Sequence, residues 1–109
     1  MAEFSDFEKL DIRVGTILQV EDFPNARNPA YKLIIDFGQI GKRNSSAQIT
    51  SLYRKEELIN KQIIAIVNFP PKKIADFISE VLVLGVYGNQ NEVVLLQTER
   101  EIANGSKIG

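Results

Sequence analysis

The sequence predicts an all-β domain, a five-stranded Greek-key barrel with one short helix between the third and fourth strands. Short apolar runs recur at spacings of 10–18 residues, which is typical of small barrels. Only one brief segment between these runs has a helical pattern. The chain has 109 residues, enough for one hydrophobic core but too few for two. We therefore expect residues 1–109 to form a single domain.

The order of elements follows from local patterns along the chain. A capping box at Ser5–Glu8 predicts a short helical turn, and alternation predicts a first strand at Asp11–Val20. Gly15 lies early in that strand, where a glycine lets the strand bend to join two sides of a barrel. A short helix is predicted at Tyr53–Leu58, with Ser51 as its cap. The remaining strands are predicted at Tyr31–Phe37, Arg43–Thr50, Gln62–Asn68, Glu80–Gly85 and Glu92–Leu96.

The composition excludes most catalytic chemistry. The chain has neither cysteine nor histidine, so disulfides, thiol catalysis and the commonest general base are all absent. No glycine-rich phosphate loop occurs, and the carboxylates are not spaced to bind a metal ion. We therefore expect a binding protein that is not an enzyme and needs no metal or cofactor.

Targeting and membrane signals are missing from the sequence. The N-terminus is acidic and lacks the basic and apolar segments of a signal peptide. No apolar run approaches the roughly 20 residues that a membrane-spanning helix needs. These features predict a cytoplasmic protein with no membrane insertion.

Charge is distributed unevenly along the chain. Residues 1–22 contain six acids and two bases, whereas residues 27–73 contain nine bases and three acids. This basic centre is able to attract phosphates or acidic peptides, or its bases simply solvate strand edges and turns. The pI of about 5.4 and the absence of aromatic rings alternating with bases argue against strong nucleic-acid binding. The candidate contacts to RNA or another acidic ligand are Arg27, Lys32, Lys42 and Arg43.

The segment Asn68–Lys73 is predicted to be a rigid loop at the mouth of a groove. Its two consecutive prolines remove two backbone donors, so the preceding strand has to stop at Asn68. The Asn68 amide is able to donate to and accept from a peptide backbone. For Phe69 the sequence leaves two readings open, a core side chain or a groove wall. Likewise, Lys72 and Lys73 either edge the groove or form a solvated turn.

Two polar side chains of the third predicted strand lie on one face. Ser46 and Gln48 are two residues apart, whereas Ala47 and Ile49 are predicted to point inward. Together with neighbouring hydroxyl groups, this face offers hydrogen bonds that do not depend on the sequence of a ligand. The alternative is an ordinary polar outer face.

Two charged residues have predicted structural partners. Arg13 lies between inward-facing residues of the first strand and is expected to pair with Asp11 or Asp36. Glu80, next to Ser79, is expected to form an exposed salt bridge to one of the two loop lysines, a contact of little energetic weight.

Several segments resemble the tRNA-binding-domain superfamily, which includes appended domains of methionyl- and phenylalanyl-tRNA synthetases. They are Leu10–Ile17, Phe23–Ala26, Tyr31–Gly38, Leu58–Ile63, Asn68–Lys73 and Ser79–Glu80. Ser45–Thr50 and Ser79–Gly85 further resemble the CsaA branch, whose members are chaperones associated with protein export. At these two places the chain departs from the usual pattern of the tRNA-binding members. The resemblance covers residues 6–109.

This resemblance implies an OB-fold core in a homodimer, with the extensions 1–11 and 97–109 at the interface. An excess of apolar residues over Val81–Leu96 agrees with such an interface, unless those residues fill the barrel. It also implies ATP-independent binding of unfolded or pre-secretory polypeptides, with an export ATPase as a further partner. The alternative is a protein that recognises structured tRNA through its backbone. The candidate peptide-binding residues are Ser46, Gln48, Asn68, Phe69, Lys72, Lys73, Ser79 and Glu80.

Overall fold

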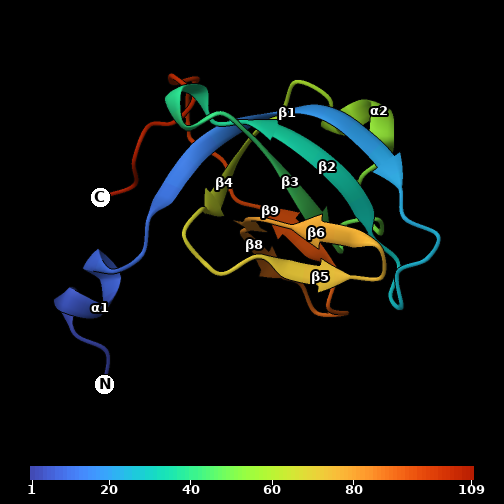
Figure 1. The fold of residues 1–109 in the computed structure, drawn as a ribbon, viewed down its shortest axis with the longest axis horizontal. Helices are drawn as coiled ribbons and strands as arrows, with labels where there is room; N and C mark the ends of the chain where they lie inside the picture. The colour runs from blue at the N-terminus through green and yellow to red at the C-terminus, as the bar shows by residue number, and fades with distance from the viewer.

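An antiparallel sheet of five strands, in the order β3-β2-β1-β4-β7, curls into a nearly closed barrel (Figure 1). The computed structural model describes residues 1–109. Its elements are α1 (Phe4–Glu8), β1 (Ile12–Asp22), β2 (Tyr31–Asp36), the 3-10 helix η1 (Gly38–Ile40), β3 (Lys42–Ala47), α2 (Lys55–Leu58), β4 (Gln62–Ile66), β5 (Lys72–Ile74), β6 (Phe77–Ser79), β7 (Leu82–Val83), β8 (Gly85–Tyr87) and β9 (Val93–Leu95). The short helix α2 lies between β3 and β4, so the predicted all-β, OB-type barrel is confirmed.

The long strand β1 serves both sides of the barrel. It pairs with β4 over its first half and with β2 over its second half, and Thr16 lies opposite a residue of each. Gly15 precedes this change of partner. A Cβ atom at Gly15 would lie 2.7 Å from side-chain atoms of both Ile35 and Phe37. Glycine is therefore required at position 15, because the core packs directly against the backbone of β1.

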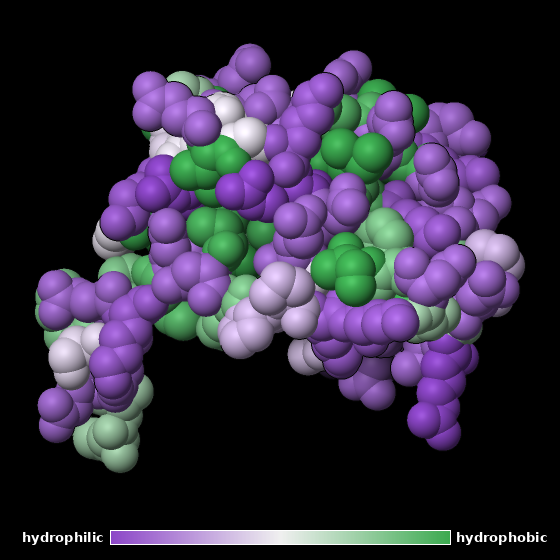
Figure 2. Space-filling model, viewed as in Figure 1, coloured by the Kyte–Doolittle hydropathy of each residue, from purple (hydrophilic) through white to green (hydrophobic).

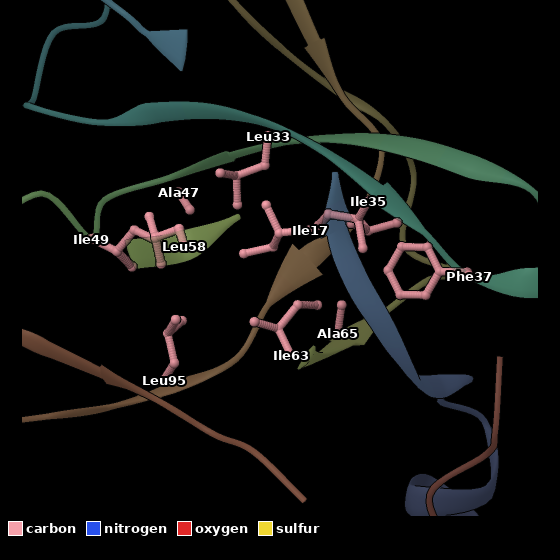
Figure 3. Close-up of a cluster of buried hydrophobic side chains, with 11 residues drawn as sticks. Ile17, Leu33, Ile35, Phe37, Ala47, Ile49, Leu58, Ile63, Ala65 and Leu95 are labelled. Carbon is pink, nitrogen blue, oxygen red and sulfur yellow. The ribbon is translucent and has the colours of Figure 1, made fainter. Parts of the chain in front are cut away.

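Eleven buried residues form the hydrophobic core inside the barrel (Figure 3). Phe37 lies at one end of this cluster, and Leu58 of α2 lies near Ile49 at the other. Ala47 and Ile49 are buried while Gln48 between them is exposed, which confirms the predicted alternation of this segment. The barrel therefore has a filled interior, and a ligand has to bind on its outside.

The caps of both helices differ from those predicted. Helix α1 begins at Phe4, so its capping acid is Asp6, whose carboxylate accepts the Glu3 N–H at 2.8 Å; Ser5 is inside the helix. Helix α2 begins at Lys55, and Glu57 accepts the N–H of Arg54 at 2.9 Å in place of a cap by Ser51. This backbone hydrogen bond lowers the pKa of Glu57. In both cases the helix starts at a different residue, so a different side chain reaches the free N–H groups.

The chain after β4 departs most from the prediction. The region predicted as a loop contains β5, which pairs with β6 in a hairpin, so Lys72 and Lys73 lie in a strand. The strand predicted at Glu80–Gly85 is divided, because β7 pairs with β4 whereas β8 pairs with β9. The third predicted strand also ends early, at Ala47. The first two differences arise because each short piece pairs with a different partner, whereas β3 ends where its pairing with β2 ends, at Ala47 opposite Tyr31.

The two chain ends behave differently. The C-terminal segment lies along its own β1 through backbone hydrogen bonds, Gly105 N–H to Val14 C=O at 2.7 Å and Ile108 N–H to Ile12 C=O at 2.9 Å. By contrast, α1 projects away from the barrel and none of its residues is buried (Figure 1). Neither α1 nor α2 has the length and hydropathy required to cross a membrane.

Candidate functional site

A groove of about 560 Å³ lies between the end of β3, the Phe69–Pro70 turn, the β5–β6 hairpin and the segment Val81–Tyr87. Ten of its 18 lining residues are hydrophobic. On the face drawn in Figure 2, apolar side chains reach the surface in separate patches between hydrophilic ones. Six of the predicted peptide-binding residues line the groove: Ser46, Gln48, Phe69, Lys72, Ser79 and Glu80.

Side chains seal the outer edge of β3 where it passes β6. The Ser46 N–H donates to Oγ of Ser79 at 2.9 Å, and the Asn44 N–H donates to Oε1 of Glu80 at 2.9 Å. Backbone pairing adds one bond, from the Glu80 N–H to the Asn44 carbonyl at 2.8 Å. The barrel is thus closed at this seam mainly by two side chains that take the place of ladder partners.

This seam changes the role expected for Glu80. The predicted salt bridge to a loop lysine is absent, since none of the ion pairs in the structure involves Lys72 or Lys73. Lys72 lies opposite Ser79 in the hairpin and lines the groove with an unpaired ammonium group. Lys73 lies opposite Ile78 on the other face of the hairpin and does not line the groove.

Phe69 lies in the groove wall and is 42% exposed, so its alternative placement in the core is wrong. The strand β4 ends at Ile66, two residues before the predicted end at Asn68, and the two prolines restrict the backbone directly after the ring. Sequence reasoning missed Ile74, Tyr87 and Val93 among the lining residues. Tyr87 lies outside the predicted strands, and its pairing with Val93 in the β8–β9 hairpin brings both residues to the groove.

Asn68 lies outside the groove lining. Its side-chain oxygen accepts the Asp11 N–H at 2.8 Å, and its amide nitrogen donates to the Lys9 carbonyl at 2.9 Å. The amide that was expected to meet a peptide backbone therefore meets the backbone of this chain. It fastens the segment after α1 to the end of β4.

None of the four bases proposed as RNA contacts lines the groove. The Lys32 ammonium lies 4.9 Å from the Phe23 ring centroid and 5.4 Å from that of Phe77. These two rings pack edge to face at 5.5 Å. This cation–π contact attaches the β5–β6 hairpin to β2 and was not anticipated from the sequence. Arg27, Lys42 and Arg43 lie elsewhere on the surface.

Arg13 has the structural role that was predicted. Its guanidinium pairs with Asp11 at 2.8 Å, and it also donates to the Gly105 carbonyl at 3.0 Å. The other predicted partner, Asp36, accepts the Gly38 N–H instead.

Acidic side chains nowhere form a group of three that is able to hold a metal ion. The groove itself offers apolar surface and hydrogen-bonding groups through its lining residues.

Comparison with known proteins gives a consistent picture. A family model described as a putative tRNA binding domain matches residues 12–107. The crystal structure of the chaperone CsaA from Bacillus anthracis is 55% identical with a TM-score of 0.96, covering 100% of this chain and 99% of that chain. The CsaA chaperone protein from Picrophilus torridus is 58% identical with a TM-score of 0.94 and full coverage of both chains.

Curated relatives include much longer proteins. A methionine–tRNA ligase from Pyrococcus horikoshii is 38% identical over 106 residues, which is 97% of this chain but 14% of the ligase. The chain therefore spans only a small fraction of the length of such a relative.

Proposed function

This chain belongs to the putative tRNA binding domain family as a CsaA-type member, and we propose that it is a non-catalytic chaperone. It holds unfolded or pre-secretory polypeptides in the cytoplasm without using ATP. The observation that carries this proposal is the open groove, whose lining is mostly apolar and whose rim presents Gln48 and Lys72. Such a surface suits extended chains of many sequences, because apolar contact and backbone hydrogen bonds require no particular residue.

The mechanism is passive. A protein that binds the unfolded form of a client lowers the concentration of free unfolded chains by mass action, with no energy source. Release follows when the client folds or when an export ATPase takes it over.

We further propose that two copies form a homodimer. Phe4 and Phe7 of α1 are 72% and 37% exposed, and they contact each other with ring centroids 6.1 Å apart. Val86 and Val94, opposite each other in the β8–β9 hairpin, are also exposed. A two-fold interface is the commonest way to cover such surfaces. The extensions 1–11 and 97–109 are its proposed components.

The test is a competitive titration by fluorescence anisotropy. A labelled extended peptide is bound first, and bulk tRNA is then added, at about 0.15 M salt so that exposed charges are screened. Peptide binding that tRNA does not displace supports the chaperone function. Tight tRNA binding without any peptide signal would overturn it.

Binding of structured tRNA is the second candidate, favoured by the family match over residues 12–107. Its proposed contacts Arg27, Lys32, Lys42 and Arg43 lie outside the groove, so the two activities are separable by mutation. Replacement of Lys42 and Arg43 by Gln leaves the Lys32 cation–π contact intact. If tRNA binds, this double variant weakens it and reduces its dependence on salt, because phosphate contacts release counterions.

A further inference from the structure

We propose that a polypeptide binds in the groove as an added β-strand, with its main chain hydrogen-bonded to the main chain of Gln48. This inference rests on the proposed chaperone function and specifies how that function recognises its client. The occupant is an extended segment that has alternating apolar side chains and an acidic residue near one end.

The first argument comes from the outer edge of β3. In an antiparallel pair, every second residue directs its N–H and C=O away from the partner strand. On β3 these residues are Asn44 and Ser46, and the next in the series is Gln48, one residue past the end of the strand. The N–H groups of Asn44 and Ser46 are occupied by Glu80 and Ser79. The backbone N–H and C=O of Gln48 make no hydrogen bond within the chain.

The unpaired part of this edge therefore begins at Gln48, where the hydrogen bonds to Ser79 and Glu80 end. Gln48 is exposed and lines the groove, so its free backbone groups lie beside the apolar lining. Unpaired strand edges are templates for pairing with another chain. The Ser79 and Glu80 caps keep the neighbouring positions closed, which limits the added strand to the groove.

The second argument comes from the walls of the groove. Phe69 and Ile74 line it from the side of the β5–β6 hairpin, and Tyr87 lines it from β8. An added strand places alternate side chains on this apolar lining and the others toward solvent. Main-chain bonds then supply affinity whatever the client sequence, and the lining selects for apolar residues at alternate positions.

The third argument is charge. Lys72 is the only base among the lining residues and has no ion-pair partner, whereas the only acid, Glu80, is held by the Asn44 N–H. An acidic residue of the client beside Lys72 completes the pairing. A basic residue at the same position is repelled by the unneutralised ammonium group of Lys72.

The experiment is an N-methyl scan of one peptide on the wild-type protein. The peptide has seven residues with alternating Val and Thr and a single terminal Glu, and each backbone N–H is methylated in turn. Strand addition predicts that methylation at one position weakens binding about fivefold to tenfold, because a single peptide N–H donates to the Gln48 carbonyl. Methylation at the other positions leaves affinity nearly unchanged.

The outcomes separate the two proposals. Binding of the unmethylated peptide with no loss at any single position of the scan overturns strand addition and leaves the chaperone function standing. Absence of any peptide binding overturns both. A matched peptide with Lys in place of the terminal Glu is expected to bind about twofold to fivefold more weakly, and equal affinity would remove Lys72 from the proposal.

Two variants of the protein complete the test. Gln48→Ala removes the side chain but keeps the main-chain groups, so affinity and the single sensitive position of the scan are expected to persist. Gln48→Pro removes an N–H that makes no bond within the fold, so binding is expected to fall about tenfold while the melting temperature changes little. The reverse order of the two variants would show that the side chain, and not the backbone, contacts the client.

Discussion

Asn68 and Asp11 are joined by a hydrogen bond of 2.8 Å between the Asp11 N–H and the Asn68 side-chain oxygen. The same Asp11 pairs through its carboxylate with Arg13, which in turn donates to the Gly105 carbonyl. The N-terminal and C-terminal segments are thereby connected to Asn68, which lies two residues past the end of β4 and one residue before the groove residue Phe69. The amide of Asn68 thus orients the N-terminal segment that carries α1.

Replacement of Asn68 by Ala is expected to release this segment. The variant loses both hydrogen bonds of the amide, so hydrogen exchange of residues 3–11 rises while exchange of the barrel strands stays the same. Asn89→Ala, at an exposed loop position, is the control and is expected to leave hydrogen exchange unchanged in both regions. Unchanged exchange at residues 3–11 in the Asn68 variant would show that the amide does not hold the segment.

Gly15→Ala is expected to destabilise the barrel by about 1–3 kcal/mol, because the added methyl group overpacks a filled core. Its Cβ would lie 2.7 Å from side-chain atoms of Ile35 and Phe37, which are both fully buried in the core. Urea unfolding measures the loss. Gly109→Ala, with nothing within 4 Å of its Cβ, is the neutral control. Equal stability of the two variants would contradict the close approach.

Ala75→Gly is expected to stabilise the β5–β6 hairpin. Ala75 has a φ of 54° at the turn of this hairpin, a left-handed conformation that costs an alanine about 1 kcal/mol relative to glycine. Thermal unfolding should show a higher midpoint for the variant. Ala26→Gly, in another turn but without a positive φ, should instead lower the midpoint, since glycine gains more entropy on unfolding. A shift of the unfolding midpoint in the same direction for both variants would contradict the conformational cost assigned to Ala75.

The lowered pKa of Glu57 predicts how the free energy of unfolding changes with pH in the acid range. Its folded pKa is lowered below the ordinary value of 4.5, first by the Arg54 N–H. A lowered pKa stabilises the fold above the ordinary value, and this contribution is lost as pH falls through the folded pKa. The stability difference between wild type and Glu57→Gln should therefore be largest near neutral pH and shrink below pH 4.5. Glu56→Gln serves as the control, and a pH-independent difference for Glu57→Gln would exclude the effect.

Phe69 tests whether the groove is the peptide site. Phe69→Ser is expected to weaken peptide binding about tenfold, because the exposed ring supplies much of the apolar wall. Ile78→Ser is the matched control, since Ile78 is 45% exposed but lies on the other face of the hairpin. Anisotropy titration compares the two. A larger loss from the Ile78 variant would move the site to the outer face.

Much of the fold was predictable from local patterns. Alternation located β1, short runs located β2, β3 and β4, the order of the runs indicated a barrel, and the polar and apolar faces around Gln48 were assigned correctly. The sequence also excluded thiol and histidine chemistry and carried the resemblance to the CsaA branch. The strand positions and the faces around Gln48 depend on residues within about ten positions of one another, where the period of side chains reports their direction.

The partners of the site residues were decided only by the tertiary structure. Glu80 caps Asn44 across 36 residues of chain, and Asn68 binds the backbone of Asp11 across 57. Lys32 lies over the ring of Phe77 because two separate sheets meet there. A local pattern shows which way a side chain points, but a hydrogen bond or a cation–π contact also requires its partner to come within a few ångströms. Folding of the barrel brings these partners together, and it leaves the Gln48 backbone open beside the groove.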